Sequence, residues 1–153
     1  SVLKEMLHGV NFEFDAIMAM ATGALPLGSL LAASLDLPFG YIRSKKKEHG
    51  KGSLIEGGVD KNLKILVFED LINQGSSIKK GVEALELDGY NVAGVISIVD
   101  YEFDVVKNYF SDKNIPKSSA IGFSDIIAYY EATPKDQETK KALLDWHKEV
   151  NCQ

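Results

Sequence analysis

The chain has 153 residues, of which 45% are hydrophobic and 25% are charged. A chain of this size can bury one central sheet but leaves little room for a second domain, so we expect a single domain over residues 1–153. The net charge of −5 argues against a general nucleic-acid-binding protein, which needs a basic surface for phosphate contacts. No apolar run approaches the roughly 20 residues that cross a bilayer, so no membrane association is expected.

Positive charge is concentrated in one segment. Residues 43–51 (RSKKKEHGK) contain five Lys or Arg and one acid, so they carry +4 while the rest of the chain carries −9. This distribution indicates a local anion site on an acidic body. The single cysteine, Cys152, cannot form an internal disulfide, which favours a reducing compartment and predicts a cytoplasmic protein.

The predicted elements alternate between short apolar strands and helices of about ten residues. In chain order they are a strand at 14–21, a helix at 26–35, strands at 39–42 and 64–68, a helix at 76–87, a strand at 92–100, a helix at 103–110, a strand at 120–123, a helix at 124–130 and a polar helix at 133–150.

Local signals set several of these boundaries. Pro26 opens the first helix, Gly89 stops the second, Ser124 is expected to cap the fourth, and Thr133 with Pro134 to start the last. The alternation predicts right-handed βαβ units, hence the α/β class with a central, mostly parallel sheet flanked by helices. The one long irregular stretch, 44–62, is expected to be a functional loop.

An acidic pair and a polar turn follow the run 64–68. Glu69 and Asp70 are expected at the carboxyl end of that strand, where ligands bind in open parallel sheets. Adjacent carboxylates suit Mg²⁺ or a sugar diol, and backbone N–H groups in the turn 73–77 suit a phosphate monoester. The alternative is that the acids only solvate the strand end and that Ser76 is an N-cap.

Two further segments point to anionic ligands. The basic run 43–52 contains Gly50 and Gly52 and reads as a flexible loop that could close over a diphosphate, although a solvated charged surface is the alternative. Residues 21–24 (ATGA) follow the first strand and could offer amides to a second anion, or form an ordinary turn. Together the three segments match the parts of one ligand, 5-phosphoribosyl diphosphate (PRPP).

Two motifs carry a family resemblance. VFEDLINQGSS (67–77) is similar to V-x-V-E-D-L-I-[ST]-T-G-G-S, and residues 43–57 are similar to R-x-K-x-K-[DE]-H-G-x-G-x-x-I-E-G. Both patterns are typical of orotate phosphoribosyltransferases, and the second is specific to them. The resemblance implies the type I phosphoribosyltransferase fold, with a flexible catalytic loop at about 44–62.

The resemblance also implies roles for individual residues. Arg43, Lys47 and His49 would be catalytic, with Lys47 stabilising the leaving group, and Asn73 would lie near orotate. Mg²⁺ would be carried by the diphosphate, with Glu69 and Asp70 as the nearest protein carboxylates. A homodimer is implied, in which loop 44–52 reaches the neighbouring active site. The expected PRPP-binding residues are Thr22, Gly23, Arg43, Lys47, His49, Glu69, Asp70, Leu71, Ile72, Asn73, Gln74, Gly75, Ser76 and Ser77.

The implied reaction joins orotate to the ribosyl carbon of PRPP, giving orotidine 5′-phosphate and diphosphate in pyrimidine (UMP) biosynthesis. The chain departs from the family at its N-terminus, where an F-x-L-x-S-G-x-x-S-P-like segment is not matched. We therefore expect the fold to lack the N-terminal hood, and the chain, which begins with Ser, to be a fragment or processed.

Other departures leave alternatives open. Asn73, Gln74 and Ser76 replace family residues in the phosphate turn, and Asp100-Tyr101 stands where some members carry an Arg that binds the base. The alternatives are a phosphoribosyltransferase for another base, a catalytically weak PRPP-binding or regulatory module, and a flavodoxin-like binding domain. The last of these leaves the basic run without a role.

Overall fold

The computed structural model describes residues 5–7, 9–45, 54–132 and 136–152. Its centre is a six-stranded sheet in the order β3-β2-β1-β4-β5-β6, in which every neighbouring pair is parallel except β2 and β3. The strands are β1 (Ala16–Met20), β2 (Phe39–Ile42), β3 (Ile55–Glu56), β4 (Lys64–Ile72), β5 (Asn91–Asp100) and β6 (Lys117–Gly122).

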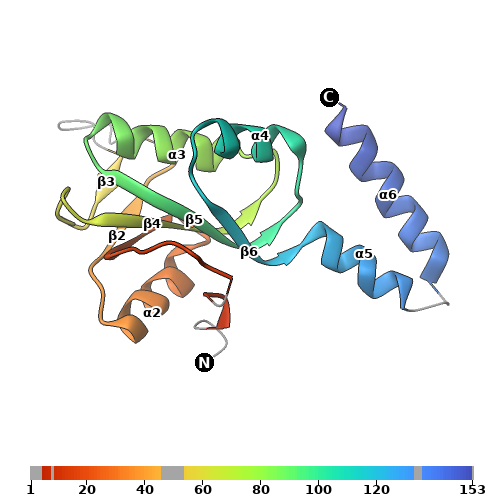
Figure 1. Ribbon diagram of the computed structural model, residues 1–153, viewed down its shortest axis with the longest axis horizontal. Coiled ribbons are helices and arrows are strands. Elements are labelled where there is room, and N and C mark those ends of the chain that lie inside the picture. Colours follow the sequence, from red (N-terminus) through yellow and green to blue (C-terminus); the bar gives the residue numbers. More distant parts are fainter. Residues whose placement is uncertain (1–4, 8, 46–53, 133–135, 153) are drawn as a thin grey trace.

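Helices cover both faces of this sheet. The described helices are α2 (Leu25–Leu35), α3 (Ser76–Leu87), α4 (Asp104–Asp112), α5 (Phe123–Glu131) and α6 (Gln137–Asn151). Helix α2 lies on one face and α3 and α4 on the other, whereas α5 and α6 extend to one side beyond β6 (Figure 1). The predicted α/β class and the mostly parallel sheet are confirmed. None of the described helices is long and apolar enough to span a bilayer.

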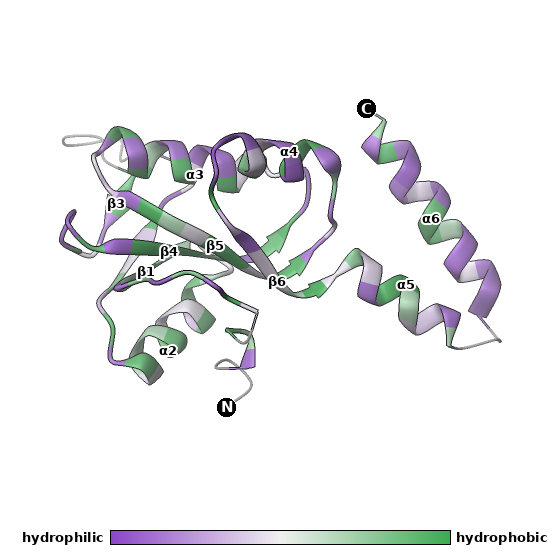
Figure 2. Cartoon of the chain, viewed as in Figure 1, coloured by the Kyte–Doolittle hydropathy of each residue, from purple (hydrophilic) through white to green (hydrophobic). Residues whose placement is uncertain are grey.

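The core explains why the central strands read as continuous apolar runs. All five residues of β1 are buried, and in β4 the residues from Ile65 to Phe68 are fully buried. Because helices cover both faces, neither strand alternates apolar and polar residues. Burying each large side chain stabilises the fold by about 1.5–3 kcal/mol. Figure 2 shows the hydrophobic strands at the centre, in contrast to the largely hydrophilic α6.

Strand β4 is longer than its neighbour β1. The pairing of β1 with β4 ends at Ala19 and Phe68, but β4 continues beside β5 to the pair Ile72 and Asp100. The prediction that Glu69 and Asp70 follow the strand was therefore wrong, because both belong to β4. They lie past the end of the β1 pairing, so this edge of β4 opens toward the turn that follows β1.

The predicted irregular stretch 44–62 contains a short strand. Residues Ile55 and Glu56 form β3, which pairs with Tyr41 and Ile42 of β2 in antiparallel register. The sequence did not reveal this strand because two residues carry no periodicity, and β3 forms through its contact with β2. Residues 46–53 of the loop lie outside the described part of the chain.

The start of α5 differs from the prediction. Gly122, not Ser124, is the N-cap, and its backbone N–H donates to the Asp125 carboxylate at 2.7 Å. Ser124 instead donates from its backbone N–H and its hydroxyl to Glu102, at 2.7 and 3.1 Å. Glu102, which is distant in the sequence, thus accepts the hydrogen bonds that a local N-cap would be expected to accept. Thr133 and Pro134, predicted to start the last helix, lie outside the described residues; α6 begins at Gln137.

Candidate functional site

The candidate site lies between β1 and β4, where the order in which the chain adds strands to the sheet reverses. From β1 the chain passes through α2 to β2 on one side, and from β4 it passes through α3 to β5 on the other. Ligands bind outside the carboxyl ends of the strands at such a switch point. The turn after β1, with Thr22 and Gly23, and the turn after β4, residues 73–75, both lie at this edge, as the sequence predicted.

The turn after β4 delivers the N-terminus of α3 to this edge. Gly75 is the N-cap, with a φ of +78°, and a Cβ atom there would lie 2.8 Å from Cγ2 of Val106, so glycine is required on both counts. The alternative in which Ser76 caps the helix is wrong, because Gly75 holds that position and has no side-chain acceptor. The first N–H groups of α3 are thus available to an anion, which the helix dipole also favours.

A hollow surrounds this helix start. It has a volume of about 150 Å³ and is lined by Glu69 and residues 71–78. Within this lining Ser76 and Ser77 are exposed, Leu71 is 42% exposed, and the side chain of Ile72 is buried in the core. The hollow therefore combines backbone N–H groups, two hydroxyls and a carboxyl group, which is the chemistry of a phosphate and polyol site.

Asp70 connects β4 to the turn after β1. A Cβ atom on Gly23 would collide with Oδ2 of Asp70, so only glycine allows this close approach. The Asp70 carboxylate accepts a hydrogen bond from the backbone N–H of Leu71 at 2.9 Å. In the turn after β1, the peptide bond between Ala21 and Thr22, just before Gly23, is cis. The structure thus brings together two segments that are some fifty residues apart in the sequence.

Glu69 lies in a different environment from Asp70. Its side chain is only 5% exposed, and its Oε1 accepts a hydrogen bond from the backbone N–H of Asp70 at 3.1 Å. Burial, followed by the neighbouring Asp70 carboxyl, raises the pKa of Glu69 to about 8. Glu69 is therefore largely protonated at neutral pH and can donate a hydrogen bond. The two adjacent acids are chemically distinct.

Arg43 contributes to a second cavity beside the first. This cavity has a volume of about 260 Å³, and its polar lining consists of Arg43, Ser44, Ser76, Ser77 and Lys80. The guanidinium Nη1 of Arg43 is 3.5 Å from Oε1 of Glu56. Lys80 was not predicted from the sequence, although its position four residues after Ser76 on α3 places both on one helix face. The cavity combines two cations and three hydroxyls.

The predicted residues are therefore placed as follows. Thr22, Gly23, Arg43 and residues 69–77 all lie around the switch point, whereas Lys47 and His49 lie outside the described residues. In the described ranges no group of three or more acidic, histidine or cysteine side chains is placed to hold a metal ion. The protein carboxylates nearest to the hollow are those of Glu69 and Asp70.

The comparisons with known proteins identify the family. Residues 2–132 match the family described as the phosphoribosyl transferase domain. The chain belongs to this phosphoribosyltransferase family. It is similar to orotate phosphoribosyltransferase of Bacteroides fragilis, with 38% identity over 138 residues, which is 90% of this chain and 65% of that protein. It is also similar to the Lactococcus lactis subsp. lactis enzyme of that name, with 37% identity over 95% of this chain and 69% of that protein.

A solved phosphoribosyltransferase shares the fold. The crystal structure of orotate phosphoribosyltransferase from Aeropyrum pernix matches with a TM-score of 0.72 and 28% identity, covering 85% of this chain and 72% of that one. The chain spans about two thirds of the length of the curated relatives it matches, 65% in the case of the Bacteroides proteins. The family resemblance and the type I phosphoribosyltransferase fold expected from the sequence are thereby confirmed.

The raised pKa of Glu69 predicts a pH-dependent stability. The folded chain holds this proton up to about pH 8, whereas the unfolded chain releases it near pH 4.5, so wild-type stability falls as pH rises through this window. Glu69→Gln removes the ionisation. Its stability relative to wild type should rise between pH 5 and pH 8, by roughly 1.4 kcal/mol for each pH unit.

Urea unfolding of wild type and Glu69→Gln at pH 5 and at pH 8 measures this difference in stability. Glu138→Gln, at an exposed position of α6, measures the general effect of removing one surface carboxylate. An unchanged stability difference between Glu69→Gln and wild type at pH 5 and pH 8 would show that Glu69 ionises like an ordinary acid.

Proposed function

We propose that this phosphoribosyltransferase transfers ribose 5-phosphate from PRPP to orotate, giving orotidine 5′-phosphate and diphosphate. The observation that carries the proposal is the convergence of three ligand-binding features at the switch point. These are the hollow at the N-terminus of α3, the Asp70 carboxylate against Gly23, and the cationic cavity at Arg43. The names of the similar proteins and the motif at residues 43–57 support orotate as the base.

Each part of PRPP has a matching environment. The 5-phosphate suits the hollow at residues 71–78, which is lined by backbone N–H groups and two hydroxyls that can donate to an anion. The ribose hydroxyls can donate to Asp70 and accept from protonated Glu69. The diphosphate suits the cavity that contains Arg43 and Lys80, with Lys47 and His49 as further cationic or donor groups supplied by the loop.

The chemistry needs positioning and charge stabilisation more than a protein nucleophile. The ribosyl carbon passes through an oxocarbenium-like state as the diphosphate leaves, and cations around the leaving group stabilise the charge that develops there. Mg²⁺ is proposed to arrive on the diphosphate, where it neutralises phosphate charge. The partly exposed carboxylate of Asp70 fits such an ion, because Mg²⁺ usually keeps substrate and water oxygens and takes one or two carboxylates from the protein.

A phosphoribosyltransferase for another base is the second candidate. The observation that favours it is the exposed turn at Asn73 and Gln74, which departs from the family pattern at the position expected to face the base. A catalytically weak PRPP-binding module is the corresponding non-catalytic candidate.

We propose a cytoplasmic location, because the only cysteine, the exposed Cys152, cannot form an internal disulfide.

An assay with a loop variant tests the main proposal. Wild type should consume orotate when PRPP and Mg²⁺ are present, and Lys47→Ala should lower kcat roughly 100- to 1000-fold, because it removes a cation from the leaving group. Lys46→Ala is the matched control, since position 46 is variable in the family pattern. Tight PRPP binding by calorimetry without turnover of any base would favour the non-catalytic module. Full activity of Lys47→Ala would refute the role of that lysine.

Lys80 should contribute to PRPP binding. Lys80→Ala removes one of the two cations of the cavity and is expected to weaken PRPP binding about tenfold, as for the loss of one charge-assisted contact. The affinity for ribose 5-phosphate should change less than twofold, because that ligand lacks the diphosphate. Lys107→Ala on α4 removes the same charge from an exposed position and serves as the control. Equal losses for both ligands would place Lys80 at the 5-phosphate instead.

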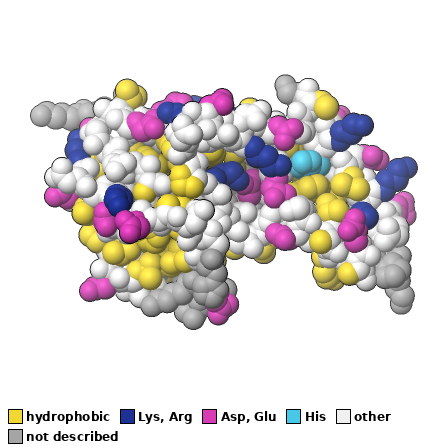
Figure 3. All heavy atoms as spheres, in the orientation of Figure 1, with side chains coloured by type: hydrophobic (Ala, Val, Ile, Leu, Met, Phe, Trp, Pro, Cys, Tyr) yellow, Lys and Arg dark blue, Asp and Glu magenta, His cyan; other side chains and the backbone are white. Residues whose placement is uncertain are grey.

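We also infer a homodimer. Helix α2 carries no charged residue, Leu30 on it is 57% exposed, and hydrophobic side chains gather over it on the face drawn in Figure 3. An uncharged, partly exposed helix suits contact with a second copy of the chain. In this arrangement the loop at residues 44–52 is proposed to reach the active site of the partner.

Subunit mixing tests the crossing loop. Lys47→Ala and Asp70→Ala should each be nearly inactive alone. After the two are unfolded and refolded together in equal amounts, half of the dimers are mixed, and each mixed dimer has one site with both groups intact. Activity should recover to about a quarter of wild type. No recovery, although light scattering confirms a dimer, would mean that each loop serves its own subunit.

A further inference from the structure

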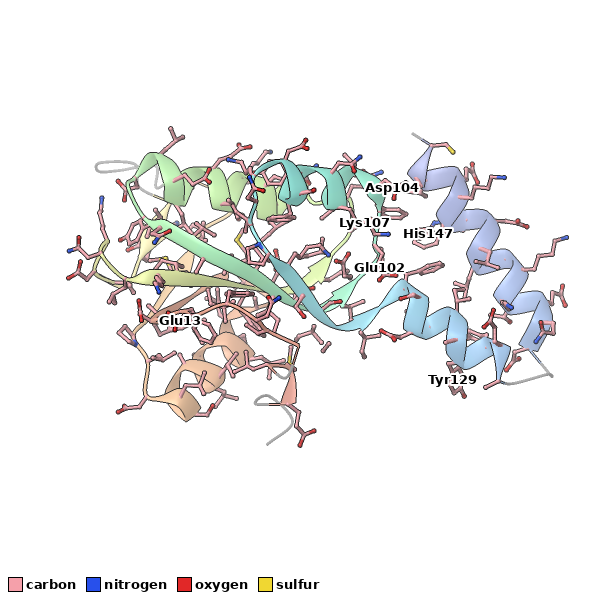
Figure 4. The ribbon with its side chains drawn as sticks, viewed as in Figure 1. Glu13, Glu102, Asp104, Lys107, Tyr129 and His147 are labelled. Carbon is pink, nitrogen blue, oxygen red and sulfur yellow. The ribbon has the colours of Figure 1, made fainter. Side chains whose placement is uncertain are left out.

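Helix α6 lies outside the residues that match the family, which end at position 132, yet it contacts the ligand-binding edge of the sheet. Besides packing on α5, it contacts Tyr101, in the turn formed by Asp100, Tyr101 and Glu102 at the end of β5, and the next residues Phe103 and Asp104. The backbone N–H of Tyr101 donates to the carbonyl of Ile72 at 2.9 Å, so this turn lies directly beside Asn73. Figure 4 shows His147 directed from α6 toward the part of the chain that holds Glu102 and Asp104.

His147 makes the central contact. Its Nε2 lies 2.5 Å from the carbonyl oxygen of Tyr101, and because a carbonyl can only accept, Nε2 carries the hydrogen. The imidazole stacks on the ring of Phe103, at 4.7 Å and 21°, and on the ring of Phe123, at 4.0 Å and 11°. Stacking on both rings fixes the plane of the imidazole and therefore the direction of the hydrogen bond.

Two neighbours on α6 reinforce this contact. The ring of Trp146 meets that of Tyr101 edge to face, with centroids 5.5 Å apart. Near the end of the helix, the side chain of Asn151 accepts from the backbone N–H of Asp104 and donates to its carboxylate, both at 2.8 Å. Helix α6 is thus attached to the segment that follows β5 at Tyr101, Phe103 and Asp104.

The other two residues of the turn, Asp100 and Glu102, are bound by residues of β6 and α5. The fully buried Asp100 carboxylate pairs with the ammonium of Lys117 and accepts from the backbone N–H of Glu102 at 2.7 Å. Glu102 has a φ of +57°, and its carboxylate is bound by Ser124. The carbonyl of Tyr101 between them is the group that α6 holds.

We propose that His147 is a positioning residue for the acceptor base. Its hydrogen bond to Tyr101 holds the turn beside Asn73, the residue proposed to lie near the base. On this proposal α6 sets the affinity for the base and has little effect on PRPP binding. The inference rests on the proposed phosphoribosyl transfer. It assigns a role to a helix that the family match does not include.

Paired substitutions test this role. His147→Phe keeps a flat ring for stacking and loses the donor, whereas His147→Gln keeps an N–H donor. His147→Phe should raise the KM for orotate five- to tenfold, the effect of one hydrogen bond, with kcat and the Kd for PRPP within twofold of wild type. His147→Gln should return the KM to within about threefold. A purely structural role predicts instead that kcat and PRPP affinity fall together with thermal stability.

Tryptophan fluorescence gives a readout that does not require turnover, since Trp146 is the only tryptophan of the chain. Orotate added to wild type with PRPP in the absence of Mg²⁺ should change its emission, and PRPP alone should not. An unchanged KM for orotate in His147→Phe would overturn the proposal. So would a Trp146 emission that stays the same at saturating orotate.

Wild-type activity separates this inference from the proposed function. If wild type transfers ribose phosphate to uracil, hypoxanthine or adenine instead of orotate, the proposed function fails, and the KM for that base in the two variants still tests His147. If wild type uses no base at all, both ideas are overturned.

Discussion

The site depends on the unequal lengths of two neighbouring buried strands. Strands β1 and β4 share a fully buried core, but the pairing stops at Ala19 and Phe68 while β4 continues to Ile72. The last residues of β4 lack a β1 neighbour, so Asp70 approaches the turn at Gly23 and the next turn carries α3 toward the same point. If the pairing of β1 ran two residues further, Met20 and Ala21 would pair with Glu69 and Asp70 and close this edge.

The same offset gives two adjacent carboxyl groups different properties. Glu69 lies deep enough for burial to raise its pKa to about 8, whereas Asp70 lies at the open edge and accepts from the backbone of Leu71. A protonated acid can donate to a sugar hydroxyl and a carboxylate can accept from one, so the pair suits a vicinal diol better than two carboxylates would. Keeping Glu69 neutral also limits the negative charge placed near an incoming phosphate.

Sequence patterns predicted the elements whose cause is local. The buried strands follow from continuous apolar runs, and α3 was predicted with its observed bounds because helical spacing and Gly89 are both encoded nearby. The end of β4 was missed because Glu69 and Asp70 break the apolar pattern while the ladder to β5 continues. Ser124 was misread because Glu102, twenty-two residues away, binds its N–H and hydroxyl. Lys80 and His147 were not predicted, because Lys80 meets the rest of its cavity and His147 meets Tyr101 only in the folded chain.

The two ends of the proposed substrate site differ in how firmly they are built. The phosphate side is made of β4 and α3, whose apolar faces are part of the buried core. The base side is proposed to depend on α6, which has no buried residue and is held by its packing on α5 and by contacts of Trp146, His147 and Asn151. Elements with little buried apolar surface open at a lower free-energy cost than core strands. Substitutions in α6 are therefore expected to change the contacts of Tyr101 at a lower cost in stability than substitutions in β4 or α3.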